Sequence, residues 1–147
     1  MSQATVDVLF ICRDGRVDSL LSNLYLAREM KGTGLNVVVF FAGEALRAVC
    51  GEAMLWSQGL QEQSVRLTMA DRAKAMGLPV TGRSDGRQID RRGLLTMANE
   101  AHIKMFACPP WVRLLALEER LLKGIKETDE ANMIKMLSEA KQVIGSL

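Results

Sequence analysis

The sequence predicts an α/β fold, a three-layer αβα sandwich around a mostly parallel sheet of about five strands. Short, nearly continuous apolar runs that are rich in β-branched and aromatic residues recur along the chain, as expected of strands covered on both faces. Segments with apolar residues at helical spacing separate these runs. This alternation implies right-handed crossovers, helices on both faces of the sheet, and strand carboxyl ends that lie along one edge.

The first predicted unit is a strand followed by a helix. Residues 6–12 (VDVLFIC) form a short apolar run that ends at a turn-like Arg-Asp-Gly-Arg segment. Asp18 or Ser19 can cap the following helix, whose apolar residues recur with the 3.6-residue period. Gly32 and Gly34 are expected to end that helix and to lead the chain back to the sheet.

The next segments repeat the pattern with a less regular middle. Residues 36–42 (NVVVFFA) are predicted to form a second buried strand, and residues 44–50 a helix. Apolar residues at helical spacing indicate a further helix over about residues 64–76. Residues 78–81 are interpreted as a third strand, since Pro79 suits a first-residue or edge position where no ladder N–H is required.

The second half of the chain contains the segment with the most chemical interest. Residues 82–88 are interpreted as an exposed turn region, and Asp90 is expected to cap the next helix. Residues 103–107 form the predicted fourth strand. It leads through Cys108 directly into a helix opened by Pro109.

A short charged edge strand over residues 124–127 and a final helix complete the predicted fold. Thr128 or Asp129 can cap that helix. Its apolar stripe consists of Met133, Leu137, Ala140 and Ile144.

Composition predicts one ordinary globular domain spanning residues 1–147. Hydrophobic residues make up 48% of the chain and the net charge is only +2, which favours neither disorder nor a dedicated nucleic-acid-binding protein. With neither a secretory signal nor an apolar run long enough to cross a bilayer, we expect a cytoplasmic protein with no membrane partner. Three cysteines without a C-x-x-C pair, and a single histidine, lead us to expect free thiols and no metal or organic cofactor.

Cys108 is the leading candidate for chemistry because it lies between a predicted strand and a predicted helix. Unpaired N–H groups and the helix dipole at such a position stabilise a thiolate relative to a thiol. Pro109 and Pro110 suit the first helical turn, although each removes one N–H donor. The alternative is that Cys108 is a small buried residue that fills the top of the sheet.

Three further residues are candidate members of the same site. Cys12 also follows a predicted strand, so it is expected at the same edge of the sheet, either as a nearby thiol or as the last core residue of its strand. Arg13 and Arg113 can place guanidinium groups near an anion at that edge, or can be solvated surface residues. Charge from either arginine would favour the thiolate of Cys108.

The sequence lacks the usual dinucleotide, phosphate-loop, serine-hydrolase and zincin motifs. A small-ligand or nucleotide site at the sheet edge is therefore the weakest of three functional hypotheses. The stronger two are a reactive Cys108 and a non-catalytic binding or assembly subunit that contacts copies of itself or a partner.

Four segments in the expected order resemble the DsrE/DsrF-like family of sulfur-relay proteins, to which TusD-like proteins belong. They are the first strand with its helix, Val37-Val38-Val39-Phe40-Phe41-Ala42-Gly43, Ala75-Met76-Gly77-Leu78-Pro79-Val80, and Ile103-Lys104-Met105-Phe106-Ala107-Cys108. The Pro-Pro-Trp that follows Cys108 departs from the small-residue stretch of several sulfur-transfer members.

The resemblance implies a sulfur-relay protein that accepts sulfane sulfur as a persulfide on Cys108 and passes it on. It also implies a homo-oligomer (a dimer, trimer or hexamer) that exchanges sulfur with donor and acceptor proteins. Some members of the family lack a working cysteine and serve as structural subunits, which matches the non-catalytic alternative.

Overall fold

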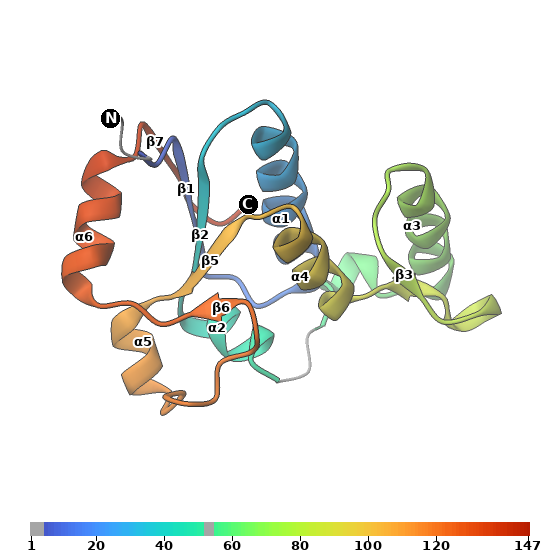
Figure 1. Cartoon of the computed structure of the whole chain (residues 1–147). Helices are drawn as coiled ribbons and strands as arrows, with labels where there is room; N and C mark the ends of the chain where they lie inside the picture. The colour runs from blue at the N-terminus through green and yellow to red at the C-terminus, as the bar shows by residue number, and fades with distance from the viewer. Residues whose placement is uncertain (1–4, 52–54) are drawn as a thin grey trace.

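The computed structural model describes residues 5–51 and 55–147. Within these ranges a five-stranded parallel sheet forms the centre of the molecule, with strand order β6-β5-β2-β1-β7 (Figure 1). Helices flank both of its faces, which confirms the predicted α/β fold around a mostly parallel sheet. The strands are β1 (Val8–Cys12), β2 (Val37–Phe41), β5 (Lys104–Ala107), β6 (Ile125–Lys126) and β7 (Gln142–Ile144).

The centre of the sheet is the centre of the core. All five residues of β2 are buried, because β1 and β5 pair with it on either side and helices cover both faces. Phe40 is fully buried and stacks on Phe106 of the neighbouring strand, with ring centroids 5.4 Å apart. This burial explains why the apolar run in β2 is continuous instead of alternating.

The helices divide between the two faces and the carboxyl edge of the sheet. α1 (Val17–Gly32) and α4 (Arg91–Glu100) pack on one face, and α6 (Glu130–Glu139) covers the other. α2 (Gly43–Val49) and α5 (Pro109–Leu114) begin at the carboxyl ends of β2 and β5. This arrangement gives the three predicted layers.

The segment from α3 (Gln63–Ala75) to β4 (Gln88–Ile89) lies beside the main sheet, and we call it the α3 arm (Figure 1). The predicted third strand, residues 78–81, is wrong as a member of the main sheet. Only β3 (Val80–Thr81) is a strand, and it pairs antiparallel with β4 in a separate two-stranded sheet. Val80 is only half-buried and Thr81 is exposed, and both pair with β4 of the same arm, so this strand takes its hydrogen bonds away from the main sheet. The 3₁₀ turns η1 (Gln58–Leu60) and η2 (Ser84–Gly86) lie before α3 and inside the arm.

Arg28 of α1 ties the α3 arm to the body of the protein. Its guanidinium donates to the carbonyl oxygens of Met76 and Gly77, each at 3.1 Å, where α3 ends. These carbonyls have no partner within their own helix, so a cation at this position satisfies them and complements the helix dipole. The arm thus docks on α1 through one side chain as well as through apolar packing.

Helix capping was predicted correctly at two positions and wrongly at one. Asp90 accepts a hydrogen bond from the Gly93 N–H at 3.2 Å, and Asp129 accepts one from the Asn132 N–H at 2.8 Å. The predicted cap of α1 at Asp18 or Ser19 is wrong. That helix begins at Val17, after a residue that makes no side-chain cap.

The end of the chain also differs from the prediction. The final helix ends at Glu139, and Ile144 belongs to β7 instead of the helical stripe. β7 adds to the free side of β1, with Gln142 opposite Val8 and Ile144 opposite Phe10. Only three residues long and mostly exposed, it carries too weak an apolar pattern to be recognised in sequence.

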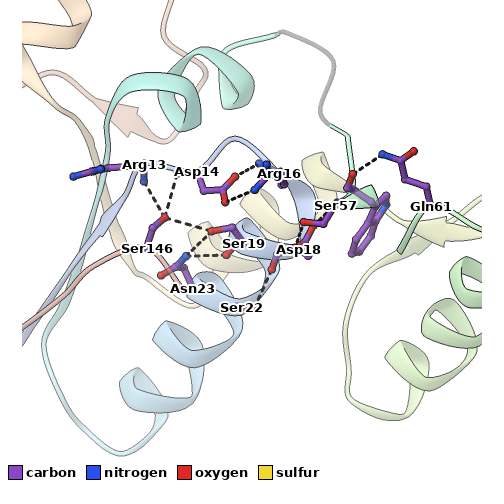
Figure 2. A network of polar contacts seen from close by, with 11 residues as sticks. Arg13, Asp14, Arg16, Asp18, Ser19, Ser22, Asn23, Ser57, Gln61 and Ser146 are labelled. Atoms are coloured by element: carbon purple, nitrogen blue, oxygen red, sulfur yellow. Dashed lines mark hydrogen bonds and ion pairs between the residues drawn. The ribbon is translucent and has the colours of Figure 1, made fainter. Parts of the chain in front are cut away.

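Asp18 of α1 holds the segment around Ser57 against this helix. Its carboxylate accepts hydrogen bonds from the Ser57 N–H at 2.8 Å and the Ser57 hydroxyl at 2.7 Å (Figure 2). Partial burial acts to raise the pKa of Asp18, but the hydrogen bonds from Ser57 outweigh it and hold the pKa below its usual value.

We expect Asp18→Asn to destabilise the protein by about 1 kcal/mol at neutral pH, since hydrogen bonds to a partly exposed charged group are lost. The folded pKa lies below the unfolded value of about 3.9, so this stabilisation is complete well above that value and is lost as the pH falls through the folded pKa. Urea unfolding of both proteins at neutral and acidic pH measures the difference. A difference that does not shrink in acid would contradict the assignment.

No helix in residues 5–51 or 55–147 combines the length and the apolar character that crossing a lipid bilayer requires.

Candidate functional site

Cys12 and Cys108 both lie at the carboxyl edge of the sheet, with β2 between them. Cys12 is the last residue of β1, and its carbonyl accepts a hydrogen bond from the Ala42 N–H at 2.9 Å. Cys108 directly follows β5, and its N–H donates to the carbonyl oxygen of Phe41 at 2.9 Å. The edge of the sheet therefore holds both sulfur-bearing residues, as the strand pattern predicts.

The Cys108 thiol lies just beneath the surface, under α6. The residue is 7% exposed, and its thiol donates a hydrogen bond to the Met133 thioether of α6, with the two sulfur atoms 3.9 Å apart. Burial raises the pKa of Cys108, and the negative charge of Glu130 raises it further. A hydrogen bond from the backbone N–H of Trp111 acts in the opposite direction and lowers it. The net result is a pKa above the ordinary value, so the thiol is the main form at neutral pH.

This outcome differs from the expected stabilisation of a thiolate. α5 is only six residues long, and its first two positions are prolines that offer no N–H donor. The Arg113 guanidinium forms an ion pair with Glu130 of α6, so part of its charge is compensated there. Burial is the largest influence on the pKa of Cys108, and the net effect of its surroundings is unfavourable to negative charge.

Cys12 is much less accessible and lies on the other side of the sheet. It is 1% exposed in the core under α1 and α4, and burial raises its pKa to about 12. Met133, the partner of Cys108, packs in the core under α6. With the sheet between the two thiols, Cys12 fits the alternative of a last core residue of its strand better than that of a nearby thiol that exchanges with Cys108. Cys50, the third cysteine, is half-buried at the end of α2, and burial raises its pKa too.

Arg13 lies in the loop after β1, at a polar network that the sequence does not reveal. The backbone N–H groups of Arg13 and Asp14 both donate to the hydroxyl oxygen of Ser146, at 3.0 and 3.2 Å (Figure 2). This oxygen is also 3.3 Å from the hydroxyl of the buried Ser19. Since β7 is not predictable from its pattern, nothing in the sequence places Ser146 against this loop.

A crevice opens at the same place, between the ends of β1, β2 and β7. It has a volume of about 730 Å³, and residues from the loops after these strands line it together with Trp111 of α5. The Arg13 guanidinium extends away from the network around Ser146 (Figure 2). Asp14, by contrast, is engaged, because its carboxylate accepts hydrogen bonds from the backbone and the side chain of Arg16.

Among the described residues, no group of three or more histidine, cysteine, aspartate or glutamate side chains is placed to hold a metal ion.

Comparison with known proteins supports the fold and adds no sequence relationship. No family model matches the sequence, and no curated protein matches it. The crystal structure of ychN protein from E. coli is similar, with a TM-score of 0.61 at 12% identity over 96% of this chain and 99% of that chain. At this level of identity the similarity extends to the fold alone.

Proposed function

We propose that the protein accepts sulfane sulfur on Cys108 as a persulfide and passes it to an acceptor thiol. The observation that carries this proposal is the position of the thiol in the fold, in a chain whose sequence resembles the DsrE/DsrF-like family. Cys108 lies at the carboxyl edge of the sheet, just under the surface, where parallel α/β folds place their reacting groups. Cys108 is more exposed than Cys12, and the backbone N–H of Trp111 can donate a hydrogen bond to the Cys108 sulfur when it is an anion.

Two exchange steps make up the proposed relay. The Cys108 thiolate attacks the outer sulfur of a donor persulfide, which forms a new sulfur–sulfur bond and breaks the one in the donor. The donor leaves as a thiolate and takes up a proton, so there is no net oxidation. An acceptor thiolate then attacks the outer sulfur on Cys108, and the Cys108 thiolate leaves.

The contacts around Cys108 set the condition for both steps. Met133 covers the sulfur, and the ion pair between Arg113 and Glu130 links α5 to α6 above it. A donor therefore reaches the sulfur only when α6 shifts away from α5. Cover of this kind slows chance reaction of the thiol and shields a bound persulfide from other thiols.

Intact-mass measurement after incubation with a persulfide donor tests the proposal. We expect the native protein to gain one sulfur atom, and Cys108→Ser to gain none. Cys50→Ser is the matched control, because Cys50 is half-buried and, like Cys108, has a raised pKa, but lies outside the proposed site. It should gain sulfur like the native protein.

Two outcomes would contradict the proposal. Equal sulfur gain by Cys108→Ser and the native protein would assign the chemistry to another residue. No gain by any protein, with circular dichroism showing that all are folded, would favour the non-catalytic binding or assembly subunit.

A further inference from the structure

The crevice beside Ser146 lies where the strand order reverses. From β1 the chain builds the sheet outward through β2, β5 and β6, and then returns to add β7 on the other side of β1. The helix after β1 and the helix before β7 pack on opposite faces. In open α/β sheets this divergence leaves a gap outside the carboxyl ends of the two strands, and ligands bind there.

The crevice carries charges of both signs, and two of them have no partner among the described residues. Arg13 and Glu44 both line it, and neither side chain forms an ion pair or a hydrogen bond with any of the described residues. The other acid of the crevice, Asp14, already binds Arg16. A ligand thus meets one available guanidinium and one available carboxylate.

A flat apolar wall completes the crevice. The Trp111 indole is 38% exposed and lies over Gly43, where a Cβ would be 3.8 Å from the ring. Gly43 has a φ of +55°, a conformation that a residue with a side chain adopts only with strain. Ile11 near the end of β1 and Ala42 after β2 add apolar surface to the crevice.

We propose that this crevice binds a small zwitterion, an α-amino acid with an aromatic or large apolar side chain. Arg13 receives the carboxylate, Glu44 receives the ammonium group, and the side chain lies against Trp111. A simple anion would meet the uncompensated charge of Glu44, and a simple cation would meet that of Arg13. A ligand with both charges neutralises both residues, and burial of its side chain against the apolar wall adds a favourable contribution to binding.

Isothermal titration calorimetry of the full chain with four probes tests the charge requirement. Phenylalanine carries both charges and the ring, 3-phenylpropionate lacks the ammonium group, phenethylamine lacks the carboxylate, and glycine lacks the ring. We expect phenylalanine to bind at least about tenfold more tightly than each of the others, since each loses a charge-assisted contact or the apolar contact. No heat of binding with phenylalanine, or equal binding of phenylalanine and 3-phenylpropionate, would overturn the inference.

Variants of the two charged residues assign the contacts. Arg13→Gln should weaken phenylalanine binding about tenfold and leave phenethylamine binding unchanged, and Glu44→Gln should show the reverse preference with 3-phenylpropionate. Arg83→Gln and Glu100→Gln change exposed residues outside the crevice and should bind phenylalanine normally. Unchanged affinity in both crevice variants would show that the ligand binds elsewhere. Because none of these variants alters Cys108, the result does not depend on the sulfur-relay proposal.

Discussion

Alkylation of Cys108 in the folded protein is expected to be slow at pH 7 and to accelerate about tenfold for each pH unit up to about pH 9. Only the thiolate reacts, and burial together with the charge of Glu130 raises the pKa of Cys108 above its ordinary value. Below that pKa the thiolate fraction grows tenfold per unit. Labelling with iodoacetamide, followed by peptide mapping, measures the rate for this cysteine separately from the other two.

Glu130→Gln tests the electrostatic part of this prediction. Removal of the carboxylate lowers the pKa of Cys108 and releases Arg113 from its ion pair, so alkylation at pH 7 should be about twofold faster. Glu139→Gln changes an exposed acid at the end of the same helix and should leave the rate unchanged.

A native rate at pH 7 equal to that of the urea-unfolded chain would contradict the burial of the thiol.

Phe40→Ala is expected to destabilise the protein by about 3–5 kcal/mol, the usual loss for a fully buried aromatic side chain. Phe40 lies in the central strand, has no exposed surface, and stacks on Phe106 across the β2–β5 pair. Since domains are stable by only about 5–15 kcal/mol, this one change removes a large share of the total. Urea unfolding of both proteins gives the difference in free energy of unfolding, provided that its dependence on urea concentration is the same in both.

Ile134→Ala is the matched control for that measurement. Ile134 is 62% exposed on α6, so its truncation should change the free energy of unfolding by less than about 0.5 kcal/mol. A loss below about 1 kcal/mol in Phe40→Ala would mean that β2 does not occupy the centre of the core.

The central strands were predictable because their burial leaves a direct trace in the sequence. β1 and β2 are covered on both faces, and only continuous apolar residues suit such positions. Two helix caps were predictable for a similar reason, since Asp90 and Asp129 act locally on the N–H three residues ahead.

Features that depend on distant partners were not predictable. β7 is a strand because β1 offers it a free edge, and its own three residues are mostly exposed. Asp18 binds Ser57, 39 residues away, instead of capping its own helix. Pairings over such separations leave no periodic signal in the sequence.

The candidate site divides in the same way. The position of Cys108 follows from the strand before it and the proline after it, both of which are local. Its raised pKa follows mainly from burial and further from the charge of Glu130, which belongs to a helix more than twenty residues later in the chain. The crevice depends in addition on Ser146 and Trp111, which only the folded topology brings to the end of β1.

The two outermost strands bear on how copies of this protein can associate. β6 has two residues and β7 has three, so each side of the sheet offers only a brief row of unpaired backbone groups. Very short edge strands make it unfavourable to join two sheets into one across subunits. Any self-association is therefore expected to rely on contact between helices. The shortness of β6 and β7 is also expected to protect the protein against edge-to-edge assembly into fibrils.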